Sequence, residues 1–323
     1  MTQTRIANLL FAVLFGASGA VAADDWPSRP IRMVAPAPAG GASDIYARLI
    51  ASKISPMLGR PVVVENRVGA AGRIGYEHVA KSAPDGYTLA LASAAILLQR
   101  AMYLSLPYDP AKDFVPISLI ALTQQLMVIP ATVQATDLRS FIALLKANPG
   151  VHNYASSGIG NPPHLAAELF AAMAGVKVIH IPLGGDGPAI TELLGGRVSM
   201  YLGSVAPLTP QVKSGKMRAL AVSGSRRSPS LPEVPTMAEA GLPGYNVSGW
   251  FGVIGVTGTP QSILDRLNDA VVKAVAMPDV RERLLETGAE PVSSSIAEFR
   301  KTINDNLDLY KDTMKRAGIP QQP

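Results

Sequence analysis

The sequence predicts an α/β protein of two lobes, and three observations support this fold class. Short apolar strands alternate with amphipathic helices, which is typical of parallel sheets covered by helices on both faces. The alternation forms two series, one before about residue 124 and one after it, and an apolar strand at 249–256 returns to the first. The 323 residues, 48% hydrophobic and 16% charged, are enough for one or two cores.

The first series and the end of the chain form one predicted lobe, residues 24–123 plus 250–323. Strand-helix-strand order in this series predicts a parallel sheet. The C-terminal part is mostly helical and polar on one side. Its expected elements are strands at 31–35, 61–66, 87–93 and 249–256, and helices at 44–58, from a glycine turn to Pro84, at 260–277 and at 296–318.

The second series forms the other predicted lobe, residues 124–249. Prolines 162 and 163 suit a first helical turn, and Gly175 is typical of a helix C-terminus. The expected elements are strands at 124–130, 152–158, 177–183, 198–204 and 218–224, and helices at 138–150, 160–175 and 187–196.

The first 23 residues have the pattern of a secretory signal peptide. Arg5 is the only charged side chain before Asp24, residues 9–15 are apolar, and Ala20-Val21-Ala22 has the small residues of a cleavage site. The apolar run is too short to span a bilayer, and no later segment reaches about 18 uninterrupted apolar residues. We therefore expect export to the periplasm and a soluble mature protein.

Composition excludes several classes of site. The chain has no cysteine, so disulfides, thiol nucleophiles and thiolate metal sites are absent. The formal charge of +5 is modest and the basic clusters have no aromatic residues between them, so nucleic acid is not expected. No two of the four histidines have metal-ligand spacing. We expect neither a metal nor a cofactor.

Residues 36–44, PAPAGGASD, form a glycine-rich turn between a strand and a helix. The first N–H groups of a helix lack intrahelical partners and carry positive partial charge, so such an end predicts an anion site. Glycine lets a ligand oxygen approach the backbone. Asp44 is either a helix cap or a residue that orients a ligand-bridging water. The candidate ligand-binding residues of this loop are Ala37, Ala39, Gly40, Gly41, Ser43 and Asp44.

Two further loops of the same kind occur in the second series, YASSGIGNPPH and PLGGDGPAI. Any one of the three loops reads equally well as ordinary turn chemistry, but together they favour a binding site. Asp186 is either a contact for a ligand amine or hydroxyl, or a solvated turn aspartate. The candidate residues are Ser156, Ser157, Gly158, Leu183, Gly184 and Asp186, with Gly160 also offering open backbone.

Two more candidates lie beside these loops. His164, at the start of the helix after the second loop, either donates to a ligand carboxylate or is an ordinary helix-end histidine. Ser93 ends a strand of the first series, and ligands of open α/β sheets lie beyond the carboxyl ends of strands.

Enzyme motifs are missing from the sequence. There is no G-x-S-x-G elbow, no G-x-x-x-x-G-K-[ST] phosphate loop, and GAAGRIG has the wrong spacing for a dinucleotide site. We expect no enzymatic activity, and an exported hydrolase is the less favoured alternative.

Eight segments occur in the order and spacing of a known family and cover the mature chain. With them the chain resembles the Bug-type solute receptors of tripartite tricarboxylate transporters. The segments are RPIRMVAPAPAGGASD, LGRPVVVENRVGAAGRIG, PDGYTLALAS, LPYDPAKDF, ASSGIGNPPHLAAELF, LLGGRVSMYL, GKMRALAV and LPEVPTMAEAGLPGY.

The resemblance implies a periplasmic binding protein of the Venus flytrap kind, type II-like, with a mainly parallel sheet in each lobe. It implies a small organic carboxylate as ligand and a permease of one large and one small membrane subunit as partner. We expect a monomer. The alternative is a receptor that reports ligand occupancy to a membrane sensor.

Two departures from the family pattern bear on the ligand. Ala37 stands where family members often have an aromatic residue, and Pro182-Leu183-Gly184-Gly185 stands where Pro-Tyr-Lys-Gly is common. The departures predict a roomier, more apolar pocket. We therefore expect a dicarboxylate, aromatic or of medium chain length, that bridges the two lobes.

Overall fold

The computed structural model describes residues 26–158, 161–183, 185–316 and 321. The predicted signal peptide, residues 1–23, lies outside the described residues, as do the candidates Gly160 and Gly184. No helix within the described ranges is both long and apolar enough to cross a membrane.

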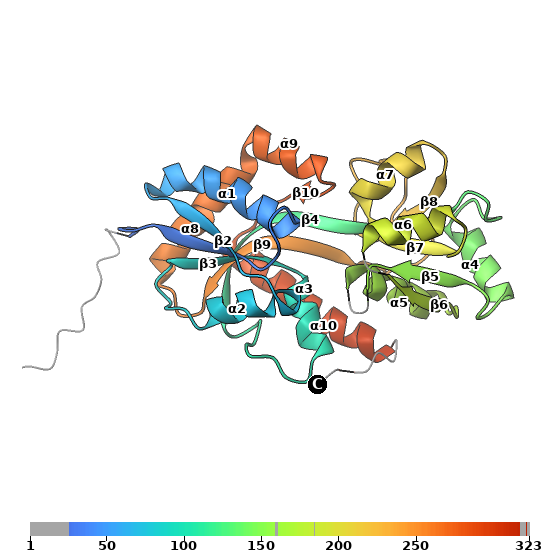
Figure 1. The fold of residues 1–323 in the computed structure, drawn as a ribbon, viewed down its shortest axis with the longest axis horizontal. Helices are drawn as coiled ribbons and strands as arrows, with labels where there is room; N and C mark the ends of the chain where they lie inside the picture. The colour runs from blue at the N-terminus through green and yellow to red at the C-terminus, as the bar shows by residue number, and fades with distance from the viewer. Residues whose placement is uncertain (1–25, 159–160, 184, 317–320, 322–323) are drawn as a thin grey trace, which may run out of the picture.

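Two α/β lobes are joined by strands that run between them, which confirms the predicted fold class (Figure 1). The long strand β4, Phe114–Pro130, belongs to both lobes. It pairs with β9, Ser248–Val256, as far as Gln124, and with β7, Met200–Ser204, from Gln125. The strands therefore form one sheet in the order β2-β1-β3-β9-β4-β7-β5-β6, with β8 and β10 also paired to β4.

The proximal lobe, on the left in Figure 1, has two apolar clusters on opposite faces of its sheet. Helices α1 and α8 supply one cluster, whereas α2, α3 and α10 supply the other. Its elements are β1 (Ile31–Ala35), α1 (Ala42–Leu58), β2 (Val62–Asn66), the short 3-10 turn η2 (Ala70–Gly72), α2 (Arg73–Ala80), β3 (Thr88–Ser93), α3 (Ala95–Met102), α8 (Gln261–Ala276), α9 (Pro278–Glu286), β10 (Glu290–Pro291) and α10 (Ile296–Arg316).

The distal lobe repeats this arrangement. Helices α4 and α5 pack on one face of its sheet, and α6 and α7 pack on the other. Its elements are α4 (Leu138–Ala147), β5 (Asn153–Ser156), α5 (Pro162–Ala174), β6 (Ile179–Pro182), α6 (Asp186–Leu194), α7 (Val205–Lys213) and β8 (Met217–Val222) with the second part of β4 and β7.

Strand directions decide where the ligand-binding loops lie. Strand β3 is antiparallel to β9 and β9 is antiparallel to β4, so β3 runs with β4 toward the distal lobe. Strand β7 is antiparallel to β4 and runs toward the proximal lobe. Because β1 and β2 run parallel with β3, and β5 and β6 with β7, the carboxyl ends of both sets face the junction of the lobes.

Helix α10 ties the two lobes together. Phe299 is fully buried in the proximal core, where its ring meets Trp250 edge-on at 4.9 Å between centroids. Gly252 leaves the space for this ring, because a Cβ at Gly252 would lie 2.5 Å from it. Farther along the helix, Leu309 packs against clusters of both lobes. The last helix, which the sequence placed with the proximal lobe, thus also reaches the distal one.

Part of the fold differs from the prediction. A strand was expected at 124–130, whereas β4 begins at Phe114, and its pairing is irregular between Pro116 and Ser118 and again between Leu119 and Ala121. A proline inside an apolar run argues against a strand because it cannot donate to the ladder, and a bulge accommodates it here. Helices α3, α7 and α9 were not predicted. The sheet is also mixed, because the strands shared by the lobes pair antiparallel.

Candidate functional site: a cleft between two sets of helix N-termini

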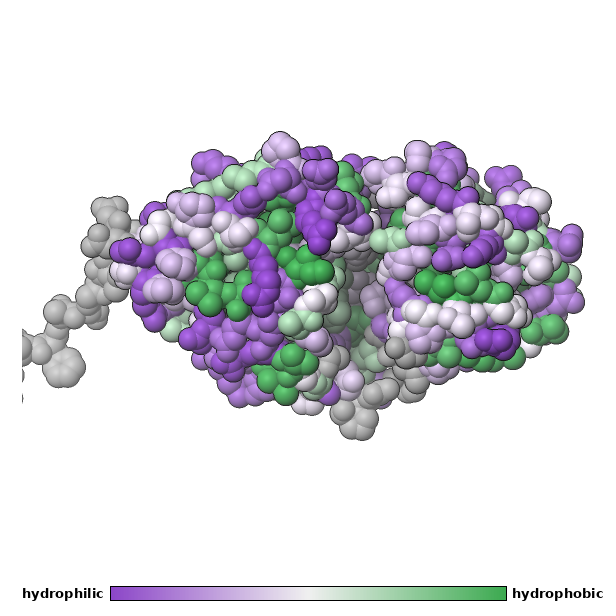
Figure 2. All heavy atoms as spheres, turned by 45° about the horizontal axis from the view of Figure 1, so that its top comes forward, coloured by the Kyte–Doolittle hydropathy of each residue, from purple (hydrophilic) through white to green (hydrophobic). Residues whose placement is uncertain are grey.

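A hollow separates the two lobes on the face shown in Figure 2. We call this hollow the interlobe cleft. Six helices begin just after the strand ends that face the junction: α1, α2 and α3 in the proximal lobe and α5, α6 and α7 in the distal lobe. The N-terminus of each helix carries positive partial charge, so the cleft suits an anion.

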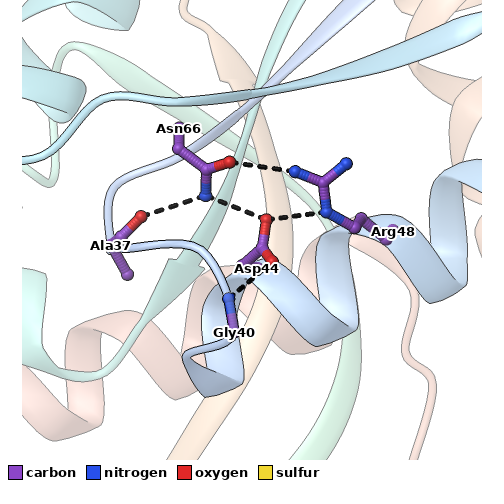
Figure 3. Close-up of polar contacts among 5 residues, drawn as sticks. All are labelled: Ala37, Gly40, Asp44, Arg48 and Asn66. Atoms are coloured by element: carbon purple, nitrogen blue, oxygen red, sulfur yellow. Dashed lines mark hydrogen bonds and ion pairs between the residues drawn. The ribbon is translucent and has the colours of Figure 1, made fainter.

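The first loop is held in shape by one carboxylate (Figure 3). Asp44 Oδ2 accepts the Gly40 N–H at 2.9 Å, and Oδ1 accepts Arg48 Nε and Asn66 Nδ2, each at 2.9 Å. Asn66 Nδ2 also donates to the carbonyl of Ala37, and Asn66 Oδ1 accepts Arg48 Nη2. Asp44 is only 4% exposed. The network therefore fixes the loop against the end of β2.

This arrangement corrects the interpretation of Asp44 as a helix cap. The N-cap of α1 is Gly41, and Asp44 lies in the first turn with its carboxylate turned back to the loop. It is therefore not the cap. Both of its oxygens accept hydrogen bonds within the chain, so its first role is to hold the loop, and an additional role in orienting a ligand-bridging water stays a prediction.

The glycines of the first loop serve the turn and offer no amide to a ligand. Gly40 has a positive φ of 80°, and its N–H is bound by Asp44. The Gly41 N–H donates to Pro38, and a Cβ at Gly41 would lie 3.2 Å from that oxygen. The amides left over are those of the first turn of α1, Ala42, Ser43 and Asp44, because the Ile45 N–H is the first to bind a carbonyl of the turn, that of Gly41.

Stability should depend on Asp44 in acid. Hydrogen bonds from Arg48, then from Gly40, hold the pKa of the Asp44 carboxyl at about 2, below its usual 3.8. A lowered folded-state pKa contributes stability above pH 4 that is lost as the pH falls toward 2. In urea titrations, the stability difference between the wild type and Asp44→Asn should shrink between pH 5 and pH 2. A difference that stays constant over this range would contradict the assignment.

The second loop differs from the prediction, because the helix that follows it has no free amide in its first turn. Helix α5 begins with Pro162 and Pro163, which have no N–H, and the His164 N–H is capped by Asn161 Oδ1 at 3.2 Å. The first turn of α5 therefore presents no unpaired amide. Its dipole still points at the cleft, but hydrogen bonds to a ligand must come from the loop itself.

Ser156 and His164 are packing residues in this structure. Ser156 is fully buried, and its Oγ lies 2.7 Å from His180 Nε2 while bonding the N–H and carbonyl of Gly158. His164 is 6% exposed and stacks on His180 with 4.1 Å between ring centroids. Burial lowers the pKa of both histidines, that of His180 to about 4. The stacked rings pack beneath the second loop, and the role of His164 as a donor to a ligand carboxylate stays a prediction.

The third loop adjoins the second. The Leu183 N–H donates to the Ser156 carbonyl at 2.9 Å, and the Leu183 side chain packs partly against the distal core. Gly185 is the N-cap of α6 with a φ of 136°, which favours glycine. Since Pro188 has no N–H and the Ala189 N–H binds Gly185, α6 leaves the amides of Asp186 and Gly187.

Tyr201 links these two loops from inside the lobe. Its hydroxyl donates to Asp186 Oδ1 at 2.5 Å and is hydrogen-bonded by the Ser157 side chain, which also accepts Asn161 Nδ2 at 2.8 Å. Asp186 is thus not the solvated turn aspartate that one interpretation of the sequence predicted.

Ser93 ends β3 at the cleft, as expected, but it is hydrogen-bonded to the buried Tyr76 of α2. Its N–H donates to the buried Tyr76 hydroxyl at 3.3 Å, and its side chain also bonds that group. Helix α3 follows at once, and its first amides, Ala95 and Ile96, add to the donors of the proximal lobe. Ala39 lies exposed at the tip of the first loop.

Three residues of the site were not predicted from the sequence. Arg48 follows Asp44 by four positions, the spacing of neighbours on a helix face, and Asn66 ends the strand beside β1; both signals were readable. Tyr201 was not, because its partners are 15 and 44 positions away in sequence. Among the described residues, no group of three or more His, Asp or Glu side chains could hold a metal ion.

Known proteins match the chain along most of its length. The family model described as "Tripartite tricarboxylate transporter family receptor" matches residues 46–319. Protein BugT of Bordetella pertussis is 37% identical over 322 residues, which cover 98% of this chain and 99% of BugT.

Two solved structures with organic acids are also similar. Rpa4515 of R. palustris with adipate is 34% identical, with a TM-score of 0.77 over 92% of this chain and 100% of that one. MatC of Rhodopseudomonas palustris with bound malate is 31% identical, with a TM-score of 0.72 over 89% of this chain and 99% of that one.

Proposed function

The chain belongs to the tripartite tricarboxylate transporter receptor family, as its eight segments predicted, and on this premise we propose that it captures an organic dicarboxylate in the interlobe cleft. The family makes the protein a periplasmic solute-binding receptor and not an enzyme. The ligand and the route by which it is handed on are our proposal.

The observation that carries the proposal is the set of helix N-termini facing one another across the cleft. In the proximal lobe, α1 leaves three first-turn amides beside those of α3. In the distal lobe, α6 leaves two. A carboxylate at each end of a ligand would bind one set of amides, and contact with both lobes would favour the closed form, because only that form offers both contacts.

The proposed ligand is a dicarboxylate of medium chain length or with an aromatic body. The similar Rpa4515 was solved with adipate, a six-carbon chain with a carboxylate at each end. Ala37 contributes only a methyl group at the first loop, and the Leu183 side chain turns partly toward the core. Both leave room between the two anion-binding ends.

We further propose the cellular setting that the family implies. Residues 1–23 would be removed on export, and the mature monomer would deliver its ligand to one large and one small permease subunit. The proximal lobe would comprise residues 24–123 plus 250–323 and the distal lobe residues 124–249, with β4 and β9 as the hinge.

A thermal-shift screen of the mature protein tests the proposed ligand class. At about 100 times its dissociation constant, a ligand stabilises the folded state by about 2.7 kcal/mol, a shift of several degrees in Tm. We expect shifts with adipate-like and terephthalate-like acids and smaller shifts with short amino dicarboxylates. Shifts with short amino dicarboxylates alone would refute the roomy pocket. A response to sugars but to no carboxylate would refute carboxylate binding.

A further inference from the structure

Asp186 and Tyr201 form a polar pair that carboxylate binding alone does not explain. Tyr201 is fully buried on β7, and burial raises the pKa of its hydroxyl, so this group stays protonated and donates to Asp186 Oδ1. Gly203 leaves the space for the ring, because a Cβ there would lie 2.0 Å from Tyr201 Cε1. The backbone of β7 is thus shaped for a tyrosine that reaches the third loop.

Asp186 differs from Asp44, the carboxylate of the first loop, in having no basic side chain beside it among the described residues. Asp44 forms an ion pair with Arg48 at 2.9 Å. In the part of the chain that the structure describes, no lysine, arginine or histidine lies within ion-pair distance of Asp186. Its one bonded side-chain partner is a neutral hydroxyl on Oδ1. Asp186 is half-buried at the start of α6, and its second oxygen, Oδ2, is left as an acceptor.

We propose that Asp186 selects ligands with a hydrogen-bond donor, a hydroxyl or an ammonium group, next to the carboxylate held by the distal lobe. The inference rests on the proposed function and narrows its ligand to a 2-substituted dicarboxylate. The amides of Asp186 and Gly187 bind the ligand carboxylate, and Asp186 Oδ2 accepts the neighbouring donor.

An unsubstituted acid leaves the Asp186 carboxylate beside another carboxylate with no donor between them. Like charges at such short range repel, more so in a cleft that closes and excludes water. A site built to bind a donor discriminates strongly against the analogue that lacks it. A hydrogen bond to a charged group corresponds to about 10- to 100-fold in affinity.

Tyr201 is a positioning residue in this account. It touches no ligand, but it bonds Asp186 Oδ1 and the Ser157 side chain together, and so holds the Asp186 carboxylate in one orientation and fixes the second loop against the third. Without its hydroxyl, Asp186 would be free to rotate and to be solvated by water.

Calorimetric titration of the mature protein with adipate, 2-hydroxyadipate and 2-aminoadipate tests the pair. The wild type should bind at least one substituted acid about tenfold or more tightly than adipate, and the preferred one identifies the donor. Asp186→Asn should reduce this preference to threefold or less, chiefly by binding adipate more tightly. Tyr201→Phe should reduce it as well.

The ratio of the affinity for the preferred substituted acid to that for adipate distinguishes a positioning role of Tyr201 from general destabilisation. General destabilisation would change the affinities for all three acids alike. Tyr245→Phe is the matched control, since Tyr245 is also buried in the distal lobe and donates to the Ala166 carbonyl at 2.8 Å; its ratio should equal that of the wild type. Equal wild-type affinity for adipate and both substituted acids, or an unchanged ratio in Asp186→Asn, would overturn this inference alone. Binding of none of the three would overturn the proposed function as well.

Discussion

Replacing Asp44 by alanine is expected to weaken dicarboxylate binding at least tenfold and to lower the free energy of unfolding by about 2 to 3 kcal/mol. The buried carboxylate joins the Gly40 amide, Arg48 and Asn66, so its loss frees the loop from the end of β2 (Figure 3). The first-turn amides of α1 would then bind a ligand only after the loop is ordered again. Calorimetric titration and urea unfolding measure the two effects.

A second aspartate supplies the control. Asp137 caps α4 by accepting the Ser140 N–H at 2.8 Å, but α4 lies at the outer end of the distal lobe (Figure 1). Asp137→Ala should lower stability and leave ligand affinity unchanged. If Asp44→Ala bound ligand as tightly as Asp137→Ala, the first loop would have no part in the site.

The largest loss of stability is expected for Phe299→Ala, about 3 to 5 kcal/mol. The ring is fully buried, packs edge-on against Trp250, and occupies the space that Gly252 leaves for it, so no neighbour can readily fill the resulting cavity. Because α10 also contacts α5 of the distal lobe, the change should loosen one lobe against the other. Urea unfolding gives the stability, and proteolysis near the hinge strands reports the loosening.

Leu104→Ala is the matched control, since Leu104 is 67% exposed and its truncation should change stability by less than about 0.5 kcal/mol. A loss below 1 kcal/mol for Phe299→Ala would show that α10 contributes little to the core.

The fold was largely predictable because its signals are local. Alternating strands and helices, the C-terminal glycine of α5 at Gly175 and the three glycine loops each follow from a few neighbouring residues. The pairing of β4 with both lobes was less visible, because Pro116 interrupts the apolar pattern of its first half. The three loops face the junction of the two lobes because of the directions of the strands. The sequence indicates these directions only through the order of its elements.

The chemistry of the site was harder to predict than its location. The missing amides of Pro162 and Pro163 could have been read from the sequence, since proline has no N–H. The stacking of His164 on His180 and the contact of Tyr201 with Asp186 could not, because each joins residues of different elements that only the folded chain brings together.

A crystal structure of the mature protein with a bound dicarboxylate would test the central claim most directly. We expect one carboxylate within hydrogen-bond distance of the amides of Ala42, Ser43 or Asp44. The other should lie equally close to the amides of Asp186 or Gly187, with the lobes closed around the ligand. A ligand held by arginine or lysine side chains, or bound to one lobe and away from these helix ends, would contradict the account.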